Sequence, residues 1–327
     1  MKRFVCFLVT VALCLSLTAC SNSGSSGAKK NKNDRLVIGF AQIGHEAGWR
    51  DAETADIQWY AARRTDTIEL HFADAQGQQE NQIKAIRNFI DMGVDVIAFP
   101  PLVETGWEEV LSECKKAEIP VILVDRGVDE STDKDLYTTM IASDHVWAGE
   151  QAAIVMQDLL GGSGVVVELE GTVGASAAVQ RKQGFDDYMA ANCPGIEIAA
   201  SQSGDFTMDM GKEVMTSFLA TYEQIDGVFC HNDEMALGAI EAIKEAGLKP
   251  GEDIKIVSVD GVKSAFEAML NGELNCTVEC TPILAQQIFD TAAALKAGET
   301  VDKWIMSDDL VYTADKVTQE VVDGRAY

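Results

Sequence analysis

The sequence is short of basic residues, of histidines and of paired cysteines, and each shortage excludes a class of function. Lysine and arginine together number 26 against 52 aspartates and glutamates, which gives a net charge of −26. A chain this acidic repels nucleic acid and anionic membrane surfaces, so neither is an expected partner. The four histidines are scattered without metal-ligand spacing, and no Cys-x-x-Cys pair occurs. Neither a structural metal nor another cofactor is therefore expected.

Motifs of nucleophilic catalysis are missing as well. The chain contains no Gly-x-Ser-x-Gly turn and no phosphate-binding glycine loop. A hydrolase that uses paired carboxylates is an alternative, but paired carboxylates are common in any chain with 52 acidic residues. We therefore expect a protein that binds its ligand without converting it. Recovery of a labelled ligand unchanged would separate these two possibilities.

The N-terminus has the features of an export signal. Lys2 and Arg3 precede an apolar run over 4–17, which is shorter than the roughly 20 residues that span a bilayer. Leu-Thr-Ala-Cys, ending at Cys20, resembles a bacterial lipobox, in which the cysteine carries the lipid; an ordinary signal with a chance cysteine is the alternative. We predict a signal peptide over 1–19 and a lipid-anchored flexible tether over 20–33, rich in Ser, Gly, Asn and Lys. The mature protein should be soluble and extracytoplasmic, held to the cell membrane only through lipidated Cys20.

After the tether, short strand-like runs alternate with helical patterns. The run over 36–40 (LVIGF) is typical of a buried strand, and Ile83, Ile86, Phe89 and Ile90 follow the spacing of an amphipathic helix. The alternation continues to about residue 124 and resumes at about residue 164. Strands separated by helices indicate parallel sheets covered on both faces. The sequence therefore predicts an α/β chain with two doubly wound lobes.

The carboxyl ends of the predicted strands are rich in Asp, Asn, Arg, Glu and aromatic residues. Ligands of open α/β sheets bind at these ends. Charged side chains hydrogen-bond neighbouring hydroxyl groups well, and flat aromatic rings cover the C–H face of a sugar ring. A small polyhydroxylated ligand between the lobes is the expectation.

Several of these segments resemble the periplasmic sugar-binding protein family of ABC importers, which includes ribose-binding proteins. The general family features are ADAQGQQENQIKAIRNFIDMGVDVIAFPP, VDR, HNDEMALGAIEAIKEAG and VSVDG. The segments IGHEAGWR, ELEGTVGASAAVQRKQGF and SQSGDFT are similar to the galactofuranose-binding branch. The resemblance runs from Leu36 to about Pro282, and more loosely to the C-terminus.

The resemblance implies a ligand pocket made of residues from both lobes. Matched position by position, its members are Glu46, Trp49, Arg50, Asp125, Arg126, Arg181, Phe206, Asn232 and Asp260. Each position also has a purely structural alternative. The alternatives are a surface ion pair for Asp125 and Arg126, a solvated charge for Arg50, core packing for Trp49 and Phe206, a helix cap for Asn232 or Asp233, and a turn for Asp260 beside Gly261.

One position departs from the family. Before Pro282, ribose-binding relatives carry a glutamine that reaches the sugar, and this chain has Cys280 there. Glu279 is adjacent but would point to the opposite face of a regular strand. His45, beside Glu46, is a second position that could tune selectivity.

The resemblance also implies the domain plan and the function. The first lobe is expected over 34–140 plus 281–310 and the second over 141–280 plus 311–327, joined by a hinge of three crossovers. The expected protein is a monomer that captures a monosaccharide, galactofuranose first, by lobe closure and delivers it to the permease of an ABC importer. The alternatives are another sugar such as ribose or galactopyranose, or a sensor that presents sugar to a membrane receptor. Sugar-responsive repressors share the fold but begin with a DNA-binding helix pair, and this chain begins with a signal and a tether.

Overall fold

The computed structural model describes residues 35–327. The predicted signal peptide, Cys20 and the tether lie outside the described residues. Within the described part, no helix combines the length and the apolar character that crossing a bilayer requires.

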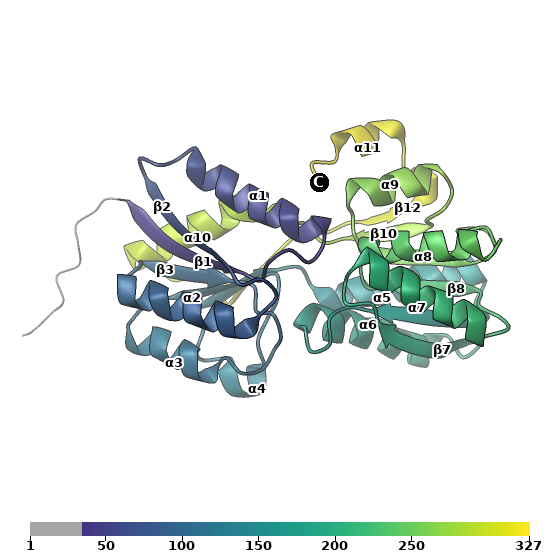
Figure 1. Ribbon diagram of the computed structural model, residues 1–327, viewed down its shortest axis with the longest axis horizontal. Coiled ribbons are helices and arrows are strands. Elements are labelled where there is room, and N and C mark those ends of the chain that lie inside the picture. Colours follow the sequence, from purple (N-terminus) through teal and green to yellow (C-terminus); the bar gives the residue numbers. More distant parts are fainter. Residues whose placement is uncertain (1–34) are drawn as a thin grey trace, which may run out of the picture. The chain divides into compact units, whose positions relative to one another are not determined.

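The first sheet has six parallel strands in the order β11-β5-β4-β3-β1-β2. Its strands are β1 (Leu36–Gln42), β2 (Ile68–Asp74), β3 (Val96–Phe99), β4 (Val121–Val124), β5 (Thr139–Ala142) and β11 (Trp304–Met306). The helices of this part are α1 (Gly48–Ala62), α2 (Gln79–Met92), α3 (Glu108–Lys116), α4 (Glu130–Asp133) and α10 (Ala285–Ala297). We call this sheet and its helices the first lobe (Figure 1).

Alternate residues of the central strands β3 and β4 enter two different cores, which explains why these two strands are apolar throughout. Ile122 and Val124 of β4 pack with helices α1 and α10, whereas Val121 and Leu123 of the same strand pack with α2 and α3. Side chains in a strand alternate between the two faces, so a sheet with helices on both faces has no polar side.

The second sheet has the order β12-β10-β9-β8-β6-β7. Its strands are β6 (Gly164–Glu170), β7 (Ile196–Ser203), β8 (Gly227–Cys230), β9 (Lys255–Asp260), β10 (Cys276–Glu279) and β12 (Val311–Thr313), of which β12 alone runs antiparallel to its neighbour among the described strands. Its helices are α5 (His145–Leu160), α6 (Ser176–Asn192), α7 (Met208–Thr221), α8 (Asp233–Glu245), α9 (Lys263–Leu270), a 3-10 turn (Ala314–Lys316) and α11 (Gln319–Gly324). This sheet and its helices form the second lobe.

The chain passes between the two sheets three times: after β5, after β10 and after β11. The predicted fold class, two doubly wound parallel-sheet lobes joined by three crossovers, is therefore confirmed. The antiparallel edge strand β12 is a local variation.

Close contact between α5 and α6 fixes the helix that carries Arg181. A Cβ atom at Gly149 of α5 would lie 2.0 Å from the carbonyl oxygen of Arg181, and one at Gly184 of α6 would lie 2.0 Å from that of Val146. Only glycine allows two helix backbones to approach this closely. The part of α6 that carries Arg181 is thus packed closely against the start of α5.

Candidate functional site

All nine predicted ligand residues line one cavity, together with Ala47 and Ala177. The first lobe supplies five of them, from the segment that leads from β1 into the first turn of α1 and from the residues directly after β4. Arg181 comes from α6, and the other three follow the carboxyl ends of β7, β8 and β9. The topology therefore brings together residues separated by more than 200 positions, as the rule for open α/β sheets predicts.

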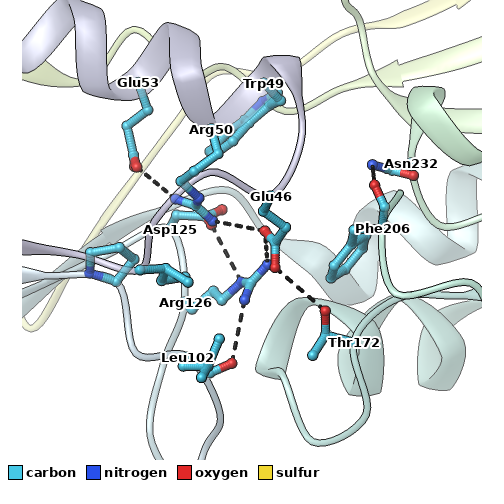
Figure 2. A network of polar contacts seen from close by, with 12 residues as sticks. Glu46, Trp49, Arg50, Glu53, Leu102, Asp125, Arg126, Thr172, Phe206 and Asn232 are labelled. Carbon is cyan, nitrogen blue, oxygen red and sulfur yellow. Dashed lines mark hydrogen bonds and ion pairs between the residues drawn. The ribbon is translucent and has the colours of Figure 1, made fainter. Parts of the chain in front are cut away.

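The first-lobe half of the cavity is a network of buried ion pairs (Figure 2). Arg50 lies 2.6 Å from Glu53 and 2.6 Å from Asp125, and Arg126 lies 2.6 Å from Glu46. Arg50, Asp125 and Arg126 are all buried. The alternatives of a solvated charge at Arg50 and a surface ion pair at Asp125 and Arg126 are therefore wrong.

The charges in this network determine its protonation. Burial opposes ionisation of Asp125, but the neighbouring guanidinium groups of Arg50 and Arg126 outweigh it and hold the pKa of Asp125 below its ordinary value. Burial dominates at Glu53 and raises its pKa, although Arg50 opposes the shift. Asp125 is thus a carboxylate that can accept hydrogen bonds from ligand hydroxyl groups.

The backbone at Asp125 is held in an unusual conformation. Its φ is 61°, in the left-handed region that residues other than glycine rarely adopt. The Nε2 atom of His145 lies 2.9 Å from the carbonyl oxygen of Asp125 and so donates a hydrogen bond to it. Burial and the charge of Arg181 lower the pKa of His145 to about 4, so the ring is neutral at pH 7. His145 therefore fixes Asp125 without adding a charge to the cavity.

In the second-lobe half of the cavity, the polar side chains are held mainly by hydrogen bonds to main-chain carbonyl groups. Arg181 donates to the carbonyl oxygen of His231 and lies 3.6 Å from the carboxylate of Asp260. Burial raises the pKa of Asp260 well above its ordinary value, with Arg181 opposing the shift. Asp260 has a φ of 127°, so its carboxyl group is presented from a strained turn.

Asn232 uses both ends of its amide within the protein. Its oxygen accepts a hydrogen bond from the backbone N–H of Met235, 3.0 Å away, and so caps α8. Its nitrogen donates to the carbonyl oxygen of Phe206 at 2.9 Å. The predicted helix cap is therefore Asn232 itself, and the cap lies on the cavity wall (Figure 2).

Two aromatic residues are at once core residues and cavity residues. Phe206 and Trp49 both belong to the apolar core of the second lobe, although Trp49 comes from α1 of the first. The guanidinium carbons of Arg126 and Arg181 lie 5.2 and 5.9 Å from the ring centre of Phe206. The core and pocket interpretations of these aromatics are thus compatible.

Several residues around the cavity escaped the sequence analysis. Glu53 is the buried partner of Arg50, and His145 supports Asp125. Thr172 and Ser176 reach from the second lobe to the first: Thr172 lies 3.4 Å from Glu46, and Ser176 accepts a hydrogen bond from the N–H of Gly127 at 2.8 Å. Of these residues, only Glu53 could have been predicted from the sequence, because it lies about one helical turn after Arg50.

On the hinge side of the cavity, the structure shows where the side chains of Glu279 and Cys280 lie. Glu279 lies 2.8 Å from Arg325 and does not line the cavity. Cys280 is buried, and its carbonyl oxygen accepts a hydrogen bond from Nε1 of Trp49 at 2.6 Å. His45 is exposed and lines a wider cleft next to the cavity.

The chemistry of the cavity suits an uncharged polar ligand. Arg50 and Arg126 each pair with a carboxylate, and Arg181 lies 3.6 Å from the carboxyl group of Asp260, so each arginine of the cavity already has an acidic partner. Guanidinium and carboxylate groups can both hydrogen-bond hydroxyl groups while they stay paired. The five cysteines in the described part are free and buried, and no cluster of metal ligands was found there.

Comparison with known proteins agrees with this geometry. Residues 38–300 match the family model described as a periplasmic binding protein domain. The galactofuranose-binding protein YtfQ of Escherichia coli is 46% identical over 291 residues, which cover 88% of this chain and 90% of the relative.

Two solved structures have similar values of sequence identity. A Mycobacterium smegmatis protein in complex with β-D-fucofuranose is 46% identical with a TM-score of 0.84, covering 89% of this chain and 95% of that one. The binding component of the arabinose ABC transporter of Shewanella sp. ANA-3, bound to α- and β-L-arabinofuranose, is 44% identical with a TM-score of 0.82, covering 89% and 99%.

Proposed function

Because the chain belongs to the periplasmic binding protein family, we propose that it captures a monosaccharide outside the cytoplasmic membrane and delivers it to an ABC importer. The observation that carries the proposal is the single cavity lined by all nine predicted residues from both lobes. A ligand held there contacts both lobes at once, so its binding energy favours the closed form.

The preferred ligand we propose is galactofuranose. The support is the 46% identity to a galactofuranose-binding protein and the furanose sugars named for two further relatives. The paired arginines favour a neutral sugar over a sugar acid or sugar phosphate, because an anion would have to displace a buried carboxylate. Ribose and galactopyranose are the competing ligands.

The lobes are proposed to move as two units, over 34–140 plus 281–310 and over 141–280 plus 311–327. The membership of the two sheets supports two such units, since β1–β5 and β11 form one sheet and β6–β10 and β12 the other. The first boundary belongs a few residues later, because residue 140 lies inside β5 (Thr139–Ala142). The protein is proposed to act as a monomer, to bind its sugar without converting it, and to be anchored through lipidated Cys20. The bacterial lipobox-like Leu-Thr-Ala-Cys supports the anchor.

Titration calorimetry of the purified full-length chain tests the proposal. Galactose, L-arabinose, D-fucose, ribose and glucose form the panel, and [1-¹³C]galactose reports by NMR which ring form is bound. We expect binding of galactose in the furanose form, loss of binding in Arg126→Ala, and unchanged binding in Arg87→Ala, whose side chain pairs with Glu109 and Glu113 on the surface.

The proposal is wrong if no sugar of the panel binds. Binding of ribose alone, or of galactose only as the pyranose, would keep sugar capture and overturn galactofuranose. A sensor would have the same pocket, and capture of permease subunits or of a receptor by the sugar-loaded protein separates the two roles. Recovery of the sugar unchanged after incubation supports binding without conversion.

A further inference from the structure

Asp233 is a buried carboxylate next to the cavity that the proposed function does not use. It is the first residue of α8 and directly follows Asn232, yet it is fully buried and does not line the cavity. An acidic residue in the first turn of a helix can serve the helix dipole alone. That role does not explain where this side chain points.

All four hydrogen bonds of the Asp233 carboxylate come from neighbouring strands and from the turn after β9. One carboxylate oxygen accepts from the N–H groups of Gly261 and Val262 at 2.7 and 2.8 Å. The other accepts from the hydroxyl of Thr277 at 2.8 Å and from that of Ser258. The helix is capped by Asn232 instead, so the two neighbours divide the tasks.

The turn held in this way is the one that presents Asp260 to the cavity. Asp260 has a φ of 127° and Gly261 one of 79°, so two consecutive residues have positive φ. A residue other than glycine in such a conformation costs of the order of 1–3 kcal/mol and persists only when the surroundings enforce it. On its other side the turn is held by Arg325, which donates to the carbonyl oxygen of Gly261 at 2.7 Å.

We propose that Asp233 is a positioning residue for ligand binding, which holds the strained turn over 260–262 so that the Asp260 carboxyl group faces the sugar beside Arg181. The inference rests on the proposed function for its effect on affinity. Its structural half, the fixing of the turn, does not depend on the identity of the ligand.

Two substitutions of Asp233 separate the loss of its hydrogen bonds from the loss of its charge. Asp233→Ala removes all four acceptors. Asp233→Asn keeps the shape, and its amide oxygen can still accept from the two N–H groups while its NH₂ group donates to the hydroxyl oxygens of Ser258 and Thr277, which can accept as well as donate. We expect the asparagine variant to behave nearly as the wild type.

Hydrogen exchange of the unliganded full-length chain tests the structural half. We expect faster exchange of the Val262 amide in Asp233→Ala, and protection retained in Asp233→Asn. Val262 is the cleaner reporter, because the Gly261 amide also lies 3.1 Å from the hydroxyl of Thr277. Unchanged protection of Val262 in the folded alanine variant would overturn the proposal, whatever the protein binds.

Sugar affinity tests the functional half. Asp233→Ala should weaken galactose binding about 10- to 100-fold, the range found when outer partners of metal ligands are removed. In an Asp260→Asn background the same change should cost about threefold or less, because the two residues act through one another. Asp226→Ala is the matched control, since Asp226 also accepts from a backbone N–H, that of Val165 at 2.7 Å, but directly precedes β8, at the amino end of that strand and away from the cavity.

The outcomes distinguish the two proposals. If the wild type binds no sugar, the proposed function fails, and exchange at Val262 still decides whether Asp233 holds the turn. Equal losses of affinity from Asp233→Ala in the Asp260 and Asp260→Asn backgrounds would show a merely structural role and overturn the positioning role. The positioning role is also overturned if Asp226→Ala weakens binding as much, or if Asp233→Asn fails to restore affinity although it folds.

Discussion

The two halves of the cavity are built in different ways. In the first lobe, charged side chains hold one another: Glu53, Arg50 and Asp125 form one chain of ion pairs, and Arg126 pairs with Glu46. In the second lobe, Arg181 and Asn232 are held by backbone carbonyl groups, and Asp260 by the strained turn that carries it. Removing one side chain should therefore cost more in the first lobe, where it leaves a partner charge buried and unpaired.

The largest effect is expected from Arg50→Ala. This change strands the buried carboxylates of Glu53 and Asp125, and breaking a buried pair in this way typically costs about 3–5 kcal/mol of the free energy of unfolding. Denaturant titration measures the loss. Arg87→Ala, which breaks ion pairs on the exposed surface, should cost less than about 1 kcal/mol. Equal losses in the two variants would remove the contrast between buried and exposed networks.

His145 stands between the two halves, and its variant His145→Gln should change the pH dependence of stability. Its pKa is about 4 in the folded protein against an ordinary 6.5, so the unfolded chain takes up a proton first as the pH falls. The stabilising contribution is complete above pH 6.5 and is lost as the pH falls to about 4. Relative to the variant, the wild type should lose up to about 3 kcal/mol across this window.

Thermal or denaturant unfolding of both proteins between pH 7 and 4 gives this difference directly. Other groups titrate in the same window, including Asp233, whose pKa burial raises to about 6, and the subtraction cancels them. A difference that stays constant with pH would contradict a neutral His145.

In the second lobe, Asn232→Ala should have a moderate effect. It removes the cap of α8 and the hydrogen bond to Phe206, for which about 1–2 kcal/mol of unfolding free energy is expected. Sugar affinity should fall as well, because Phe206 lines the same cavity. Asp95→Ala, which removes the acceptor for the N–H of Val37 at the amino end of the first sheet, should lower stability without lowering affinity. A loss from Asn232→Ala as large as that from Arg50→Ala would break the comparison between the halves.

The smallest effect is expected where the halves touch. Ser176→Ala removes one hydrogen bond between the lobes, the one from the N–H of Gly127. A single hydrogen bond contributes about 0.5–1.5 kcal/mol, which corresponds to roughly two- to tenfold in affinity. Stopped-flow kinetics should place this change in the dissociation rate, since the contact forms only on closure. An unchanged dissociation rate would show that the contact does not hold the closed form.

Local patterns were enough for most of the fold. The run over 36–40 lies in β1, and β1–β4 and β6–β9 fall within the two stretches where the sequence analysis expected strands and helices to alternate. Strand β5 lies in the interval between these stretches and was not expected. Helix α5 was not anticipated, although it is one of the longer helices. It packs on the sheet and on α6 through small residues such as Gly149 and Ala152, so it lacks the clear polar and apolar faces of a surface helix.

Only the residues that line the cavity could be predicted, and that prediction came from the resemblance to the sugar-binding family. The supporting residues depend on contacts over long stretches of sequence. His145 meets the carbonyl oxygen of Asp125 across a crossover, and Asp233 meets the turn after β9 from the start of α8. No spacing rule in the sequence records such contacts, and Asp233 looked like one of two candidates for a helix cap.

The position of Trp49 gives the molecule a built-in optical reporter. This indole comes from α1 of the first lobe, packs in the core of the second, and hydrogen-bonds the carbonyl of Cys280 at the crossover after β10. Any separation of the lobes must pull it out of that apolar contact. Trp107 and Trp304 keep their contacts within the first lobe and Trp147 within the second, and Trp59 is already exposed to solvent. The fluorescence of one tryptophan should therefore follow opening and closing in real time, without an attached dye.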